Sequence, residues 1–154
     1  MVKKKANQPK RIMNRRAKFD YELGDSLVVG LALSGAETKS LRMGHGHLRG
    51  AYVTVSKDNE LLLINATITG SSGILISESD QTRARKLLAK RREIDSLIDA
   101  KQQGRTIVPL EILNSGRFIK LRIAIGKGKK SYDKRQVLKK RDEDRSIRSA
   151  LKSR

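Results

Sequence analysis

Apolar residues alternate with polar ones in several short stretches of the chain, as in β-strands that bury one face. The alternation is clearest at residues 117–125, where four apolar side chains are interleaved with Lys120 and Arg122. Successive side chains of a strand point to opposite faces of a sheet, so this stretch predicts one buried face and one basic, solvent-exposed face. An apolar run rich in Val and Leu over residues 27–34 predicts another strand.

Short polar turns separate two pairs of such stretches, which predicts two β-hairpins. Residues 51–56 and 60–65 flank a turn of three polar residues, and residues 106–113 and 117–125 flank the turn at 114–116. Five or six short strands with helical insertions, in a chain of 154 residues, favour a mainly β fold. We expect a small OB-fold-like closed antiparallel barrel with two or three helices.

Two segments carry helix signals. Ser34 and Glu37 have the spacing of a capping box and Gly44 is a stop signal, which predicts a short helix over residues 35–43. The spacing of apolar residues predicts a longer helix over residues 83–103, ended by Gly104.

The polar side of the longer predicted helix is strongly basic. It is expected to carry Arg83, Arg85, Lys86, Lys90, Arg91 and Arg92. Two interpretations stay open, a solvated charged face and a ridge that binds phosphates.

The net charge of +19 exceeds what solubility requires and predicts a polyanionic partner, most often a nucleic acid. The charge is concentrated at the two ends. Residues 1–18 hold eight basic and no acidic side chains, and residues 127–154 hold twelve basic and four acidic ones. We therefore expect a basic N-terminal arm over 1–14, a folded body over 15–126 and a basic C-terminal tail over 127–154. A solubilising tail without a specific target is the alternative.

Several classes of protein are disfavoured. The chain has no cysteine, which excludes disulfides, Cys-ligated metals and a thiol nucleophile. His45 and His47 lie in a glycine-rich loop without further ligands, so we expect neither a metal nor a cofactor, and no enzyme constellation stands out. No apolar run is long enough to cross a membrane, which makes a cytoplasmic location the default. Five aromatic residues are too few for a base-stacking platform.

The segment at residues 126–130 superficially has the composition of a phosphate-binding loop, but its spacing does not fit one. We interpret it as a flexible basic hinge that leaves the last strand. It also belongs to an ordered set of motifs along the whole chain. These motifs are Lys3-Lys4-Lys5-Ala6, Asn14-Arg15-Arg16-Ala17, Gly30-Leu31-Ala32-Leu33-Ser34-Gly35, Lys39-Ser40-Leu41-Arg42-Met43-Gly44, Ala51-Tyr52-Val53, Thr82-Arg83-Ala84-Arg85-Lys86-Leu87-Leu88 with Arg92-Glu93-Ile94, and Gly126-Lys127-Gly128-Lys129-Lys130 followed by Asp133-Lys134-Arg135.

The ordered set resembles the SsrA-binding protein (SmpB) family. The resemblance implies an OB-like barrel that binds the tRNA-like domain of transfer-messenger RNA (tmRNA) and delivers this RNA to stalled ribosomes in trans-translation. It also implies elongation factor Tu as a partner and a tail that enters the vacant mRNA channel near the small-subunit decoding region. The tail is expected to be disordered in isolation and helical on the ribosome. We expect a monomer without a membrane partner.

Two groups of residues are expected to act in these contacts. The expected RNA-binding residues are Lys39, Arg42, Arg83, Arg85, Lys86, Leu88, Lys90, Lys120, Arg122, Lys127, Gly128, Lys129 and Lys130. The expected ribosome contacts of the tail are Tyr132, Asp133, Lys134, Arg135, Ile147 and Leu151. The chain departs from the family pattern at Val28, where an acidic residue is common, at Lys90, and in the loop at 71–76.

Two other classes of function stay open at this point. An OB-fold ribosomal protein or translation factor that binds structured ribosomal RNA has the same composition. An RNA-modifying enzyme is a third hypothesis, but it requires a metal or cofactor ligand set that the sequence does not offer.

Overall fold

The computed structural model describes residues 11–153, in which an antiparallel sheet is surrounded by several helices. The main sheet has seven strands in the order β1-β8-β4-β5-β7-β2-β9. Their bounds are β1 Ile12–Met13, β2 Tyr21–Leu31, β4 Tyr52–Val55, β5 Leu61–Ile64, β7 Arg85–Leu88, β8 Thr106–Leu113 and β9 Lys120–Gly128. A small second sheet pairs β3 (Gly46–His47) with β6 (Thr67–Ile68).

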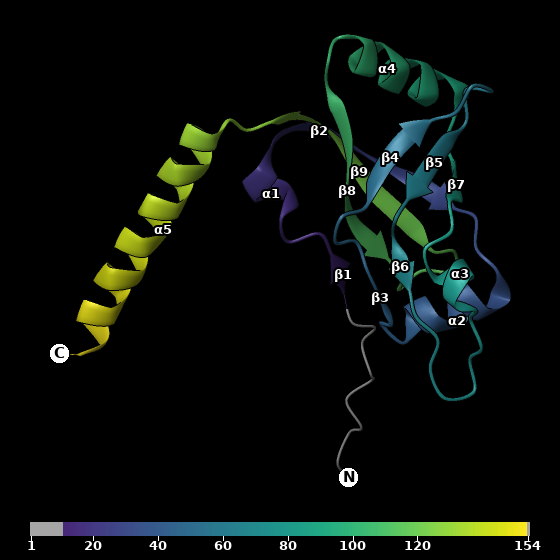
Figure 1. Cartoon of the computed structure of the whole chain (residues 1–154), viewed down its shortest axis with the longest axis horizontal. Coiled ribbons are helices and arrows are strands. Elements are labelled where there is room, and N and C mark those ends of the chain that lie inside the picture. Colours follow the sequence, from purple (N-terminus) through teal and green to yellow (C-terminus); the bar gives the residue numbers. More distant parts are fainter. Residues whose placement is uncertain (1–10, 154) are drawn as a thin grey trace.

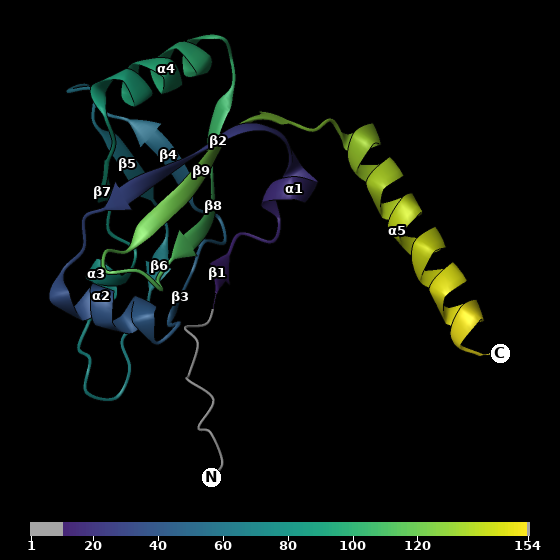
Figure 2. The ribbon, with the colours of Figure 1, turned by 180° about the vertical axis from the view of Figure 1, so that it is seen from behind.

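Strand pairing runs around the molecule. β8 pairs with β9 as well as with β4, so the path of pairings from β8 through β4, β5, β7, β2 and β9 returns to β8. In Figure 1 the strands β4 and β5 lie toward the viewer, and β2 and β9 come forward in the opposite view of Figure 2. The β2 and β4 strands therefore face opposite sides of the molecule.

The predicted strand at 27–34 and both predicted hairpins are confirmed. β2 contains residues 27–31 of the first and ends before residues 32–34. β4 pairs with β5 through a tight turn in which Asn59 has a positive φ of 57°, and β8 pairs with β9. The alternation predicted over residues 117–125 is also confirmed in β9, because Leu121 and Ile123 are buried while Lys120 is exposed.

The helix predicted over 83–103 is wrong in its first third. Residues 85–88 form the strand β7, and the helix α4 spans Arg91–Gln102. β7 pairs with β5 on one side and with β2 on the other. Its burial has a period of two residues, with Arg85 and Leu87 inside and Lys86 and Leu88 outside. The polar Arg85 at an inward position concealed this period in the sequence.

The predicted capping box is present at the start of α2 (Gly35–Arg42), as expected for the helix over 35–43. The Glu37 carboxylate accepts a hydrogen bond from the Ser34 backbone N–H at 2.9 Å, and the Glu37 N–H donates to the Ser34 hydroxyl at 3.3 Å. The other helices are α1 (Ala17–Asp20), α3 (Glu78–Gln81) and α5 (Ser131–Lys152). None of the helices in the described part of the chain is both long and apolar enough to cross a membrane.

The apolar core is formed mainly by the buried side chains of the main-sheet strands. Leu61, Leu63, Leu121 and Ile123 are fully buried there. α2 contributes Leu41 to the same cluster, while Leu97 anchors α4. These contacts hold β7, β2 and β9 in place, and the outer faces of these strands are open to a partner.

The sheet extends beyond the boundaries that the charge distribution predicted. Ile12 pairs with Ile112 and is buried in the core, although the predicted arm spans residues 1–14. Residues 1–10 of that arm lie outside the described part. At the other end, β9 continues to Gly128, which pairs with Tyr21. A Cβ atom at Gly126 would lie 3.2 Å from the Cβ of Tyr21, so glycine there permits close strand pairing.

Candidate nucleic-acid interface

The outer surface of β7, β2 and β9 brings together several of the predicted RNA-binding residues. Gly30 on the central strand β2 pairs with Leu88 of β7 on one side and with Lys120 of β9 on the other. Val28 on the same strand pairs with Arg122. Val28 and Lys120 are exposed, and 54% of Leu88 is accessible to solvent. We call this surface the β2 face.

Gly30 shapes the centre of the β2 face. A Cβ atom at this position would lie only 3.1 Å from the Cβ of Leu88. Without a side chain at position 30, the side chain of Leu88 lies close to the backbone of β2. A nucleic-acid backbone can approach such a surface closely.

The cations of the β2 face differ in how far they are neutralised. The Lys86 ammonium is 2.5 Å from a carboxylate oxygen of Glu60, and Arg122 forms an ion pair with Glu111. Lys120 forms no ion pair with any of residues 11–153. Lys90 is exposed where α4 begins, and its backbone N–H donates to Glu93 at 2.8 Å. Lys120 and Lys90 are therefore the cations most available to phosphates.

The prediction that Arg85 contacts RNA is wrong. Its side chain is 0% exposed and its guanidinium is 2.9 Å from the carboxylate of Glu37, which is itself 1% exposed. The same guanidinium donates to the backbone carbonyls of Ala66, Asp80 and Gln81 at 2.7, 2.9 and 3.0 Å. All of these bonds are internal, so Arg85 joins α2 to the segment around α3 and β7.

Arg83 belongs to the same internal cluster. Its Nε and Nη2 donate to the two carboxylate oxygens of Glu37 at 2.9 and 2.6 Å, a bidentate arrangement. Burial is the largest influence on the pKa of Glu37 and raises it, but the hydrogen bonds from Arg83 and Ser34 and the charge of Arg85 outweigh it and lower the pKa overall. The hydrogen bond to Glu37 raises the pKa of Arg83. We call Glu37, Arg83 and Arg85 the Glu37 cluster.

The two predicted residues on α2 have different surroundings. The guanidinium of Arg42 donates to the backbone carbonyls of Asn114, Gly116 and Arg117 at 3.3, 2.9 and 2.8 Å. Arg42 therefore holds the tip of the β8–β9 hairpin, although its side chain is exposed. Lys39 is exposed on the same helix.

The predicted hinge is shorter than residues 126–130. Lys127 and Gly128 pair with Glu22 and Tyr21 in the sheet, and both are exposed. Lys129 donates from Nζ to the Lys18 carbonyl at 2.9 Å, so only Lys129 and Lys130 link the sheet to α5.

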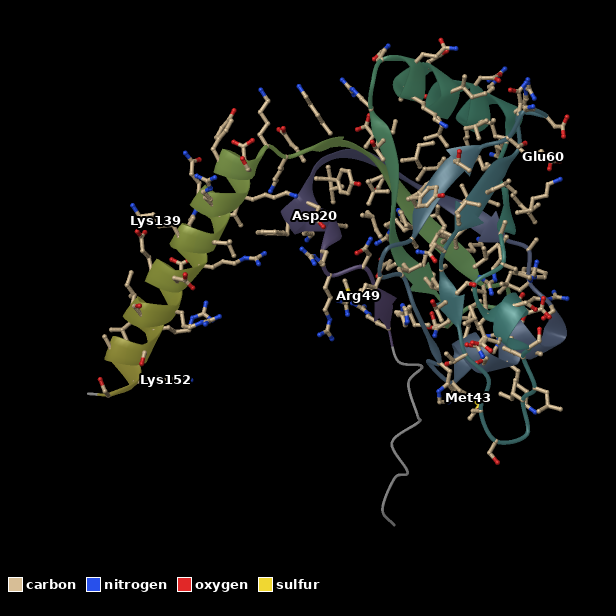
Figure 3. The ribbon with its side chains drawn as sticks, in the orientation of Figure 1. Asp20, Met43, Arg49, Glu60, Lys139 and Lys152 are labelled. Atoms are coloured by element: carbon tan, nitrogen blue, oxygen red, sulfur yellow. The ribbon has the colours of Figure 1, made fainter. Side chains whose placement is uncertain are left out.

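α5 projects away from the sheet and touches the body near α1 (Figures 1 and 2). Asp133 lies in its first turn, as expected, and accepts a hydrogen bond from the Lys130 N–H at 3.3 Å. Lys134 is 3.2 Å from a carboxylate oxygen of Asp20 and lies over the ring of Phe19. Figure 3 labels Asp20 at α1.

The other predicted tail residues face solvent. Tyr132, Arg135, Ile147 and Leu151 are all exposed. They are available to a partner, and none of them stabilises the folded body.

Sequence reasoning missed a basic cleft of about 1040 Å³ between α1, β4 and β8. Arg15, Arg16, Arg49 and Lys101 line it, and Figure 3 labels Arg49 beside α1. The only signal for it was the Arg15-Arg16 pair within a family-like motif, because Arg49 and Lys101 are isolated cations in the sequence. β4, which lines part of the cleft, faces the opposite side of the molecule from β2 in Figures 1 and 2.

The two histidines lie at β3, which pairs with β6. Within residues 11–153, no group of three or more His, Cys, Asp or Glu side chains is placed to hold a metal ion.

A mainly antiparallel sheet with an exposed basic face, a second basic cleft and a basic helix is typical of a protein that binds a nucleic acid. The family model described as "SmpB protein" matches residues 11–153, so the chain belongs to the SmpB family. It is 42% identical to an SsrA-binding protein of Prochlorococcus marinus subsp. pastoris, over 99% of this chain and 87% of the relative. It is 41% identical to an SsrA-binding protein of Oenococcus oeni, over 99% of both chains.

A solved structure is also similar. It is described as "tmRNA-SmpB: a journey to the center of the bacterial ribosome", and a chain in it matches with a TM-score of 0.63 and 36% sequence identity. The match covers 79% of this chain and 85% of that one. The family that the motifs suggested is thereby confirmed.

Proposed function

We propose that the protein binds the tRNA-like domain of tmRNA through the β2 face and delivers this RNA to stalled ribosomes for trans-translation. The observation that carries the proposal is the exposed strip of Leu88, Gly30 and Lys120 across three paired strands. An apolar contact beside a cation on a flat surface suits structured RNA, which proteins recognise mainly by shape and by phosphate contacts. The names of the relatives and of the similar structure support the same function.

The finer architecture also belongs to this proposal. The circular path of strand pairings supports a closed, OB-like barrel as the body. We propose that this body acts as a monomer in the cytoplasm, where stalled ribosomes and elongation factor Tu are its partners. It needs no cofactor and performs no catalysis of its own.

The C-terminal segment is proposed to act on the ribosome. Tyr132, Arg135, Ile147 and Leu151 are exposed on α5, which suits a helix that enters a channel lined by RNA. Asp133 stabilises its first turn next to the positive end of the helix dipole. We expect the isolated segment 127–154 to be largely unfolded, because helices of about 20 residues are marginal in water.

The basic cleft supports a second contact. Its lining includes β4, which faces the opposite side of the molecule from β2, and this supports an RNA at each site at the same time. We propose that the cleft binds ribosomal RNA while the β2 face holds tmRNA.

The test is to purify the tagged protein from cells and sequence the RNA that accompanies it. We expect strong enrichment of tmRNA with the wild-type chain and loss of this enrichment with the double variant Leu88→Asp, Lys120→Ala. Stoichiometric recovery with ribosomal subunits and no tmRNA would instead indicate a ribosomal protein. A variant with Asp133, Lys134 and Arg135 replaced by Ala should still enrich tmRNA but fail to support peptide tagging. Tagging at the wild-type rate would overturn the role of the tail.

A further inference from the structure

Phe118 is an exposed aromatic residue at the tip of the β8–β9 hairpin. Its accessible fraction is 69%, the largest of any aromatic side chain in residues 11–153. The guanidinium of Arg117 lies over its ring, 5.4 Å from the centroid. The ring and the guanidinium together offer a flat apolar surface beside a positive charge, which are the two features that a nucleotide recognises.

The hairpin tip is held rigidly. The three carbonyls of Asn114, Gly116 and Arg117 accept hydrogen bonds from Arg42, and the buried Asn114 side chain donates to the Leu41 carbonyl at 2.7 Å. Phe118 therefore lies on a preorganised support, and a ligand that covers it does not have to order the loop first.

Phe118 continues the β2 face. Exposed and buried side chains alternate from Phe118 through Ile119, Lys120 and Leu121 to Arg122. Phe118 lies in the bend two residues before β9 begins, so its exposed ring is close to Lys120, the first residue of that strand. The ring is thus next to the cation at one end of the β2 face.

We infer that Phe118 stacks on an unpaired nucleobase of the RNA that the β2 face binds, with Arg117 beside it for a neighbouring phosphate. The inference rests on the proposed function. A nucleotide matches both the ring of Phe118 and the charge of Arg117. The flat face of its base covers the ring, and the adjacent phosphate neutralises the arginine. An apolar pocket of a protein would cover Phe118 but leave Arg117 and Lys120 without anions. Structured RNA offers such a base in its loops and bulges.

A unique fluorophore makes this testable, because the chain has no tryptophan. The variant Phe118→Trp should bind the tRNA-like domain of tmRNA, and its fluorescence should be strongly quenched as the bases stack on the indole. Leu151→Trp is the matched control, since Leu151 is exposed on α5 far along the tail. Its fluorescence should change little.

The affinity measurements separate stacking from charge. Phe118→Ala should weaken binding by about fivefold to tenfold without changing the slope of log Kd against log salt concentration. Lys120→Ala should make that slope shallower by about 0.7 to 0.9, because one phosphate contact is lost. Phe118→Leu should bind as weakly as Phe118→Ala, since leucine has no flat ring.

The outcomes distinguish the two proposals. If the wild-type protein fails to bind this RNA, the proposed function itself is wrong. If the wild-type binds and Phe118→Ala binds equally well, or if Phe118→Leu restores full affinity, stacking is overturned while the function stands. Normal RNA binding by Phe118→Ala together with loss of a protein partner would assign the ring to a protein contact and also overturn the inference. Equal urea midpoints for the variants and the wild type verify that the fold is intact.

Discussion

The two sides of β7 use the same kinds of side chain for opposite purposes. On the inner side, Arg85 is completely buried and its charge is compensated by Glu37. On the outer side, Lys86 and Leu88 face solvent on the β2 face. A basic residue and an apolar residue have thus exchanged their usual places, because the cation is inside and the leucine is outside.

The exchange shows that residue type alone does not identify an RNA contact. Removing two charges from water is costly, and the Glu37 cluster offsets that cost only because nearly every polar atom has a partner. The outer side has no such requirement, since water solvates Lys86 and Lys120. An inner cation is therefore expected to determine stability and an outer one to determine binding.

The largest effect is expected on the inner side. Arg85→Ala should lower the free energy of unfolding by about 3–5 kcal/mol, because the buried Glu37 carboxylate loses a partner. Urea denaturation measures this directly. The control is Lys120→Ala, which should change the free energy of unfolding by less than about 0.5 kcal/mol. Equal stability of the two variants would contradict the distinction between the sides.

The inner side should also make stability depend on pH. The pKa of Glu37 is lower in the folded protein than in the unfolded chain, so folding favours its ionised form. The stabilisation is therefore fully present above the unfolded pKa of about 4.3 and is lost as pH falls through the lower, folded pKa. Urea midpoints of the wild type and Glu37→Gln should differ clearly at pH 7 and converge below about pH 4. A constant difference over this range would show that the charge of Glu37 is not the stabilising feature.

Sequence patterns predicted the parts of the fold whose signals are local. The alternation at 117–125, the turns of both hairpins and the Ser34–Glu37 capping box each lie within a few residues. The strand at 85–88 failed because its inward position is an arginine, and the carboxylate that makes its burial possible is 48 residues away in the chain. No local pattern contains that information.

The candidate site was predictable to a similar extent. Lys120 and Arg122 lie on the outer side of β9, as the alternation predicted, whereas Lys86 was expected on a helix and lies on the strand β7. Arg42 and the Glu37 cluster use their guanidinium groups in contacts within the protein. The cleft around Arg49 went unnoticed because tertiary packing, rather than sequence spacing, brings its lining residues together. The ring of Phe118 went unnoticed because it lies in a bend, outside any periodic pattern. Tertiary contacts decide which cations are free.

The outer side should respond in binding but not in stability. Gly30→Val should weaken binding to the tRNA-like domain by about tenfold or more, because the added side chain meets Leu88 and keeps the RNA away from the strand backbone. Leu88→Ala should weaken it by a smaller factor through lost apolar contact. Fluorescence anisotropy with labelled RNA measures both, and the tail variant Leu151→Ala is the control for a lost exposed leucine. Unchanged affinity in Gly30→Val would exclude the β2 face as the binding surface.

The smallest effect is expected where α5 meets the body. Exposed ion pairs contribute less than about 1 kcal/mol, so the contacts of Lys134 with Asp20 and Phe19 can bias the direction of the helix without fixing it. The chain has no cysteine, so spin labels on single cysteines at Ser56 and Ser149 report one distance between body and helix. Phe19→Ala with Asp20→Ala should broaden this distance distribution, whereas Asp144→Ala, on the exposed part of α5, should leave it unchanged. An unchanged distribution in the double variant would mean that the residues linking β9 to α5 set the direction of the helix by themselves, and that the body and the tail are independent of each other.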